Sequence, residues 1–355
     1  MKKIIGLILS CLTAFTALAG FAGCGSESET ISSDYGADAY EYLKYIDKNL
    51  SDRDCAGGVN YVDAQNYIKS ELVSAGYAAN DIKEQEFTFT TKSKGEVTAK
   101  NLYIVKKGES DKQIIIGGHY DGTGTGDNGS GTSLNLITAV KFCKVQTYYS
   151  LEFVFFSAEE YGCYGSKAFV NAMTEEEKAN TVYMINMDSI VAGDYTYLYG
   201  GVQNNETKTV NDTQAYDNAQ KAAESLGLEF LTNPWTFKNP EPLHCNDEGK
   251  YVSNYDESGE VTGTPAYAAP STGNWSDHAA FKKAGIKYLY FEATNWTLGP
   301  DFDGYEETLT AGPVMNTDWD NLTFIEGHFP GRCLKHLTKF STLLNTLLQQ
   351  KNLDF

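Results

Sequence analysis

Four short clusters of metal-ligating residue types follow one another along this 355-residue chain. They lie at residues 117–121 (GGHYD), 126–131 (GDNGSG), 157–162 (SAEEYG) and 186–189 (NMDS). The first, third and fourth directly follow apolar runs that predict strands. His, Asp and Glu side chains bind zinc, and paired metal sites of this kind catalyse hydrolysis. The order of the clusters therefore predicts a two-metal hydrolytic site at strand ends.

The histidine of the first cluster is the strongest single ligand candidate. His119 follows an apolar run and two glycines, which allow a sharp turn of the backbone. Asp121 lies close enough in sequence to hold the second ring nitrogen and to fix the tautomer. A hydrogen-bonded core histidine is the alternative for such a position, and the neighbouring carboxylates favour the ligand.

The carboxylates of the other clusters have complementary candidate roles. Asp127 precedes a helix and either caps it or uses its two oxygens to bridge two cations about 3.5–4 Å apart. Glu159 and Glu160 are adjacent, and two like charges so close are costly unless a cation or a proton lies between them. One can bind metal while the other accepts a proton from water; two solvated loop glutamates are the alternative. Asp188 follows a mostly apolar run, a poor place for an unpaired charge.

The surrounding pattern alternates strands with helices. Expected strands are 84–90, 97–105, 113–117, 151–156, 182–185, 195–199 and 286–291. Expected helices lie within 38–76, with a break at Gly57-Gly58, and at 130–142, 214–226 and 324–347. The alternation predicts an α/β fold with a doubly wound, mostly parallel central sheet, helices on both faces and an antiparallel edge hairpin. Ligand sites in such sheets lie beyond the carboxyl ends of the strands, where three of the clusters fall.

The first residues predict an export signal. A basic start, an apolar stretch and small residues assign 1–23 to a signal peptide. The small residues before Cys24 also match a lipobox, which predicts that a lipid on Cys24 attaches the protein to the membrane. The alternative is a plain signal peptide that is cleaved near this position without lipid attachment. Residues 24–36 form a polar tether, and 37–355 a single catalytic domain with an irregular insertion at about 231–273.

Composition narrows the class of partner. The net charge of −19, without a Lys/Arg cluster, argues against nucleic-acid binding. The seven cysteines include no CxxC pair, which argues against a thiolate zinc site, and their pairing stays open.

Together the clusters resemble those of the bacterial secreted di-zinc aminopeptidases, whose superfamily includes glutaminyl cyclases. The resemblance covers about residues 59–347, and residues 276–281 (SDHAAF) are similar to a further family motif on the substrate side of the site, which includes Asp277. It implies two zinc ions and a role for each candidate. His119 and Asp188 would bind one zinc, Asp127 would bridge, Glu160 would bind the second, and Glu159 would be the general base.

One position departs from the family pattern. The last ligand usually comes from His-Thr-x-x-Asp, whereas residues 316–320 read NTDWD, so that Thr317 and Asp320 match and Asn316 replaces the histidine. An amide oxygen is a weak zinc ligand that suits harder ions, which weakens the second site. Three other histidines are alternative donors, namely His244, His278 and His328. His328 precedes a Pro-Gly pair and is better interpreted as structural.

These features predict an exported metallo-aminopeptidase, either secreted or lipid-anchored at the cell surface, that hydrolyses the N-terminal bond of peptides. Two alternatives remain. Asn316 favours a weak or inactive relative that keeps the scaffold and binds at most one metal, and the wider superfamily includes cyclases with a single zinc.

Overall fold

The computed structural model describes residues 33–233, 267–296, 298, 307–353 and 355, and the backbone of 243–245 and 251–253. The predicted signal peptide, Cys24 and most of the predicted insertion lie outside the described residues. Within the part of the chain that is described, no helix is both long and apolar enough to span a membrane.

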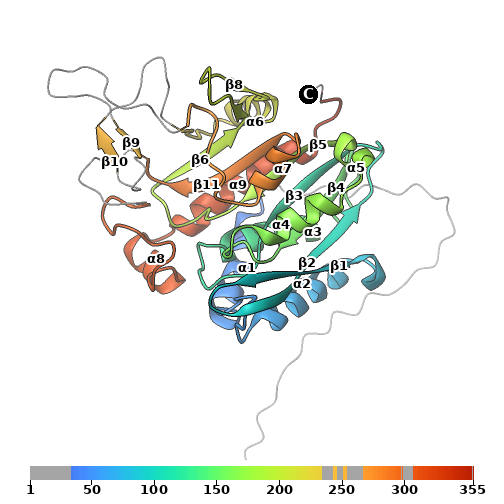
Figure 1. Ribbon diagram of the computed structural model, residues 1–355, viewed down its shortest axis with the longest axis horizontal. Helices are drawn as coiled ribbons and strands as arrows, with labels where there is room; N and C mark the ends of the chain where they lie inside the picture. Colours follow the sequence, from blue (N-terminus) through green and yellow to red (C-terminus); the bar gives the residue numbers. More distant parts are fainter. Residues whose placement is uncertain are drawn as a thin grey trace, which may run out of the picture.

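A seven-stranded sheet forms the centre of the fold, in the order β1-β2-β4-β3-β5-β11-β6 (Figure 1). The strands are β1 (Lys83–Thr91), β2 (Gly95–Lys106), β3 (Gln113–His119), β4 (Ser150–Phe156), β5 (Thr181–Met187), β6 (Tyr195–Gly200) and β11 (Tyr288–Thr294). Neighbours among β4, β3, β5 and β11 pair in parallel, and the β1–β2 hairpin joins β4 antiparallel. The predicted mostly parallel sheet with an antiparallel edge hairpin is confirmed. The opposite edge is also antiparallel, because β6 pairs antiparallel with β11, and this was not predicted.

The central strands are apolar throughout because they are buried on both faces. Along β3, Ile114 and Ile116 pack into one hydrophobic core, while Ile115 points into the core on the other face. A strand covered on both sides reads as a continuous apolar run rather than an alternating one.

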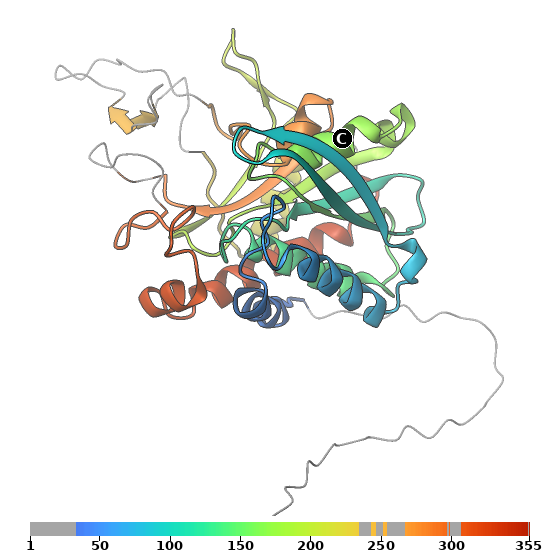
Figure 2. The same ribbon diagram turned by 60° about the horizontal axis from the view of Figure 1, so that its bottom comes forward.

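Helices cover both faces of the sheet. One layer contains α1 (Gly36–Asn49), α2 (Tyr61–Ala75), α3 (Gly129–Phe142), α6 (Gln214–Ser225) and α9 (Arg332–Leu348). On the other face lie α4 (Tyr164–Ala172), followed by α5 (Glu175–Asn180), and α7 (His278–Lys283). Figure 2 shows the blue α1 and α2 and the red α9 together below the sheet, with the orange α7 above it. Smaller elements are η1 (Ala79–Asp81), β7 (Val202–Gln203), β8 (Val210–Asn211), β9 (Leu243–Cys245), β10 (Tyr251–Ser253) and α8 (Leu322–His328).

The closing helix differs from the prediction of one helix over 324–347. It is divided into α8, which ends at His328, and α9, which begins at Arg332. Pro330 lacks an amide hydrogen, and Gly331 has a φ of 78°, so the chain cannot stay helical through this pair. The short helices α4, α5 and α7 were not predicted.

Candidate metal centre

Three of the predicted ligands meet at the carboxyl edge of the sheet. His119 is the last residue of β3, Asp188 directly follows β5, and Asp127 lies in the loop before α3. Parallel neighbours β3 and β5 end at the same edge, which brings their terminal residues together. The loop carrying Asp127 is closed by Asn128, whose side chain caps α3 by accepting a hydrogen bond from the Gly131 amide at 2.8 Å.

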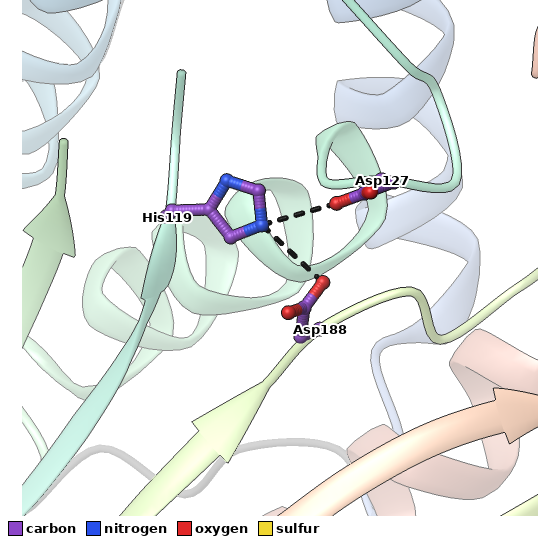
Figure 3. A group of neighbouring side chains, drawn as sticks. All are labelled: His119, Asp127 and Asp188. Carbon is purple, nitrogen blue, oxygen red and sulfur yellow. Dashed lines mark hydrogen bonds and ion pairs between the residues drawn. The ribbon is translucent and has the colours of Figure 1, made fainter. Parts of the chain in front are cut away.

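The imidazole of His119 points its Nε2 toward two carboxylates (Figure 3). Its Nε2 is 3.1 Å from Asp127 Oδ1 and 3.3 Å from Asp188 Oδ1. One ligand atom from each of the three buried residues lies within 4.8 Å of the others, a spacing that suits a shared metal ion. Burial alone would lower the pKa of His119, but Asp188 and Glu159 outweigh it and raise that pKa well above the ordinary value.

The predicted base lies beside this group. Glu159 Oε2 is 3.9 Å from His119 Nε2, and Glu159 Oε1 accepts a hydrogen bond from the Cys163 thiol at 3.3 Å. Burial raises the pKa of Glu159 well above its usual value, although His119 opposes the shift. A carboxylate in such surroundings is suited to accept a proton.

Glu160 lies at the margin of the site. The residue is exposed, but its carboxylate lies against Gly122, where a Cβ would clash with it. Loss of solvent around the carboxylate and the nearby Asp127 raise the pKa of Glu160 to about 8. Glu160 is not among the three residues whose ligand atoms cluster.

Asp121 lies beside the second ring nitrogen of His119 and also contacts the predicted base. Its Oδ1 is 3.7 Å from His119 Nδ1, which is longer than a hydrogen bond, and the ring nitrogen has no hydrogen-bond partner. The same oxygen accepts a hydrogen bond from the Glu159 amide at 3.3 Å. Asp121 therefore positions the backbone of the predicted base.

The segment around residue 276 supports Asp188. Ser276 Oγ donates to Asp188 Oδ2 at 2.6 Å and accepts from Asn186 Nδ2 at 2.7 Å. Asp277 is buried, neither of its oxygens has a hydrogen-bond partner, and burial raises its pKa to about 7. Ser276 lies in the predicted 276–281 motif, and its contact with Asp188 was not predicted.

The 316–320 segment reaches the site through its last residue. Asp320 is buried, and its two oxygens accept hydrogen bonds from the amides of Gly126 and Asp127 at 2.5 and 2.9 Å. Asn316 is exposed in a turn, with a φ of 59°. The segment thus fixes the Asp127 loop. Met315, which directly precedes Asn316, has its sulfur 3.5 Å from Ser189 Oγ, next to Asp188.

The alternative histidine donors have other partners. His278 is buried, its Nε2 hydrogen-bonds to the Gly273 carbonyl at 2.8 Å, and its ring stacks on Tyr290. Burial lowers its pKa to about 3, so the ring is neutral. His328 is exposed at the end of α8, with Nδ1 2.9 Å from the Phe324 carbonyl oxygen. The side chain of His244 lies outside the described residues.

A buried arginine beneath the site was missed. Arg53 is 1% exposed and donates to the carbonyls of Leu50, Tyr120 and Gly124 at 2.6, 2.9 and 2.7 Å. Its charge lies near the site carboxylates, yet two of these three hydrogen bonds go to the loop that follows His119 and the third goes to Leu50. The only signal in the sequence was a basic residue between Asp52 and Asp54.

The donor set fits a zinc ion. One imidazole and several carboxylates share a buried space, and among the described residues the nearby Arg53 bonds to carbonyls rather than to these acids. Such a concentration of negative charge needs a cation or bound protons to be stable.

Comparison with known proteins agrees with this chemistry. Residues 101–236 match the model of Peptidase family M28. Over these residues the chain is similar to Peptidase family M28, and they contain all four clusters. It is 29% identical over 298 residues to the alkaline phosphatase isozyme conversion protein of Escherichia coli (strain K12), covering 75% of this chain and 76% of that protein.

Solved structures show the same fold. A zinc aminopeptidase from Bacillus subtilis is similar with a TM-score of 0.61 at 15% identity, covering 89% of this chain and 95% of that chain. A glutaminyl cyclase from an Acidobacteriales bacterium is similar with a TM-score of 0.61 at 17% identity, covering 93% of this chain and 100% of that chain. The family resemblance predicted from the sequence is confirmed, and these findings support the prediction of a zinc metallopeptidase.

Proposed function

We propose that the protein is a zinc-dependent aminopeptidase that hydrolyses the N-terminal peptide bond of peptide substrates. The proposal depends on the position of Glu159. Its Oε2 lies 3.9 Å from His119 Nε2, the same nitrogen that faces Asp127 and Asp188. A candidate base thus lies next to a candidate metal site.

A zinc ion in this site would polarise the scissile carbonyl and lower the pKa of a water molecule. His119, Asp127 and Asp188 would hold it, with Glu160 beside them. Glu159 would take the proton from the attacking water, since its carboxylate lies beside the group that would hold the metal. Asp121 and Cys163 keep Glu159 oriented during the transfer.

The second candidate function is a weak or inactive relative that binds one metal. The amide of Asn316 at the position of the family histidine favours it, because the group of clustered ligands contains a single imidazole, that of His119. We therefore propose that one zinc binds tightly and that a second binds weakly.

Hydrolysis of leucine p-nitroanilide by zinc-loaded protein tests the main proposal. We expect release of p-nitroaniline that is lost on chelation and restored by zinc. The same preparation is assayed with an N-terminal glutamine peptide, where cyclisation without anilide hydrolysis would indicate a glutaminyl cyclase. Stoichiometric zinc binding with neither reaction would support the inactive relative.

We also propose that the mature protein is exported and carries a lipid on Cys24. The run of small residues before that cysteine supports this proposal. Detergent partitioning of the wild type and of Cys24→Ser tests it, and equal solubility of the two would contradict it.

A further inference from the structure

A groove separates α4 from α7 on the face of the sheet opposite α1 and α9. The two helices lie side by side (Figure 1), and the cavity along them has a volume of about 760 Å³. Its floor is apolar, formed in part by Val170, Ala279 and Ala280.

Lysines dominate the charge of this groove. Its lining includes four lysines, namely Lys167, Lys178, Lys282 and Lys283, and no Asp or Glu. The whole chain has 47 acidic residues and 28 basic ones, so a lining whose charged residues are all basic differs from the average composition of the chain. We call these four residues and the apolar floor the lysine groove.

Three of these charges are not neutralised by carboxylates. Lys178 pairs with Glu175 at 2.9 Å, whereas Lys167, Lys282 and Lys283 form no ion pair within the described residues. Lys167 Nζ donates to the Gly162 carbonyl at 2.7 Å, and Lys282 Nζ donates to the Thr272 carbonyl at 3.0 Å. These bonds orient the two ammonium groups without neutralising them. The Lys282 ammonium also lies over the Tyr288 ring, and burial lowers its pKa, whereas Lys167 and Lys283 are exposed.

Helix dipoles do not explain the whole set. Lys282 and Lys283 are in the last turn of α7, where a cation is favourable. Lys167 is the fourth residue of α4, near the end where a cation is unfavourable. The helix dipoles therefore do not account for a lysine from each of the two helices in one groove.

One residue of the groove lining, Cys163, also contacts the candidate base. Cys163 lines it, and the Cys163 thiol donates to Glu159 Oε1 at 3.3 Å. Lys167 follows Cys163 by four residues, and four residues of a helix rise by about 6 Å. An extended peptide covers the same distance with about two residues. An extended substrate leaving the site would therefore reach the lysines two or more residues beyond the cleaved bond.

We propose that the lysine groove binds a carboxylate of the peptide substrate at its third or fourth residue, so that acidic peptides are the preferred substrate class. This proposal rests on the proposed aminopeptidase function. The carboxylate comes either from a Glu or Asp side chain or from the carboxyl terminus of a short peptide.

Matched peptides separate the two sources. Leu-Ala-Glu-Ala-amide is compared with Leu-Ala-Gln-Ala-amide for the side chain, and Leu-Ala-Gln with Leu-Ala-Gln-amide for the terminus. Binding is measured by competition against a fluorescent Leu-Ala-Glu-Ala peptide on zinc-loaded Glu159→Gln protein, and kcat/KM on the wild type. We expect about 3- to 10-fold preference for the charged member of at least one pair, decreasing with salt.

The lysines are tested by charge removal. The double variant Lys167→Gln/Lys283→Gln should lose the preference, and Lys167→Arg/Lys283→Arg should retain it. Lys48→Gln is the matched control, because Lys48 is exposed on α1 on the opposite face. Leucine p-nitroanilide is too short to reach the groove, and its hydrolysis should not change in the double variant.

The outcomes distinguish the two proposals. Anilide hydrolysis with equal binding of charged and neutral peptides would overturn the lysine groove and leave the aminopeptidase standing. Binding preference that the double variant loses, without any anilide hydrolysis, would support the groove and overturn the aminopeptidase. A preference that survives in the double variant would also overturn the groove.

Discussion

Asp320 accepts a hydrogen bond from the backbone amide of Asp127, at 2.9 Å from its Oδ2, although 193 residues separate them. The other oxygen of Asp320 accepts from the Gly126 amide at 2.5 Å. A carboxylate with both oxygens engaged in this way fixes the backbone of the loop. The position of the candidate bridging ligand is thus set by a residue from the far end of the chain.

Asp320→Asn should weaken zinc binding by about 10–100-fold and lower the free energy of unfolding by about 1–3 kcal/mol. The amide nitrogen of asparagine would face one of the two backbone N–H groups and leave it without an acceptor. Competitive zinc titration and denaturant unfolding measure the two effects. Asp318→Asn is the control, since Asp318 is exposed two residues earlier, and equal behaviour of the two variants would contradict the role of Asp320.

Glu159→Gln should reduce turnover by about 10²–10⁴-fold while the zinc content stays normal. The amide cannot accept the proton from water, whereas the candidate ligands His119, Asp127 and Asp188 remain. The measurements are anilide hydrolysis and metal analysis on the same preparation. Glu176→Gln in α5 is the control, because it removes one exposed carboxylate away from the site. Retained activity in Glu159→Gln would show that another residue is the base.

Asn316→His should raise both the zinc stoichiometry and the turnover above those of the wild type, which should hold about one tight zinc. The backbone at Asn316 has a φ of 59°, a conformation in which histidine is also found. Asn316→Gly keeps this backbone without adding a donor and should leave the metal count unchanged. Two tight zinc ions in the wild type, unaffected by Asn316→His, would show that the ligand set is completed by other residues.

Metal-free protein should lose thermal stability as the pH rises from 6.5 to 8. Burial raises the pKa of Asp277 and Asp320 to about 7 and that of Glu307 to about 8. An acid whose pKa is higher in the folded state stabilises the fold below its unfolded pKa, and this stabilisation is lost as the pH rises through the folded pKa.

Two buried histidines do not oppose this trend in the chosen range. Burial lowers the pKa of His278 and His336 to about 3, so both are neutral in the folded state, and above pH 6.5 they are mostly neutral when unfolded as well. Calorimetry in EDTA should show Tm falling by about 5 °C between pH 6.5 and 8. A Tm that rises over this range would contradict the raised pKa values.

Arg53→Met should destabilise the protein by about 3–5 kcal/mol. The change leaves the carbonyls of Leu50, Tyr120 and Gly124 without the donor that Arg53 supplies. Arg53→Lys should recover only part of the stability, because one ammonium cannot reproduce the planar fork of a guanidinium. Denaturant unfolding measures both variants, and a loss below about 1 kcal/mol in Arg53→Met would show that water replaces these bonds.

The sequence by itself determined the central strands and the order of the clusters at their ends. Buried parallel strands are continuous apolar runs, and a residue such as His119 or Asp188 directly after one must lie at the carboxyl edge of the sheet. These are local patterns, so the three clustered ligands and the candidate base could be named before the fold was known.

Tertiary structure decided which residues support them. The contacts of Asp320 with Asp127, of Ser276 with Asp188 and of Arg53 with the loop after His119 join segments far apart in the chain. Strand order and loop packing determine these contacts, and the periodicity of apolar residues in the sequence does not predict them. The exposure of Asn316 and the lysine groove likewise depend on how separate elements pack, which is why only the folded chain shows them.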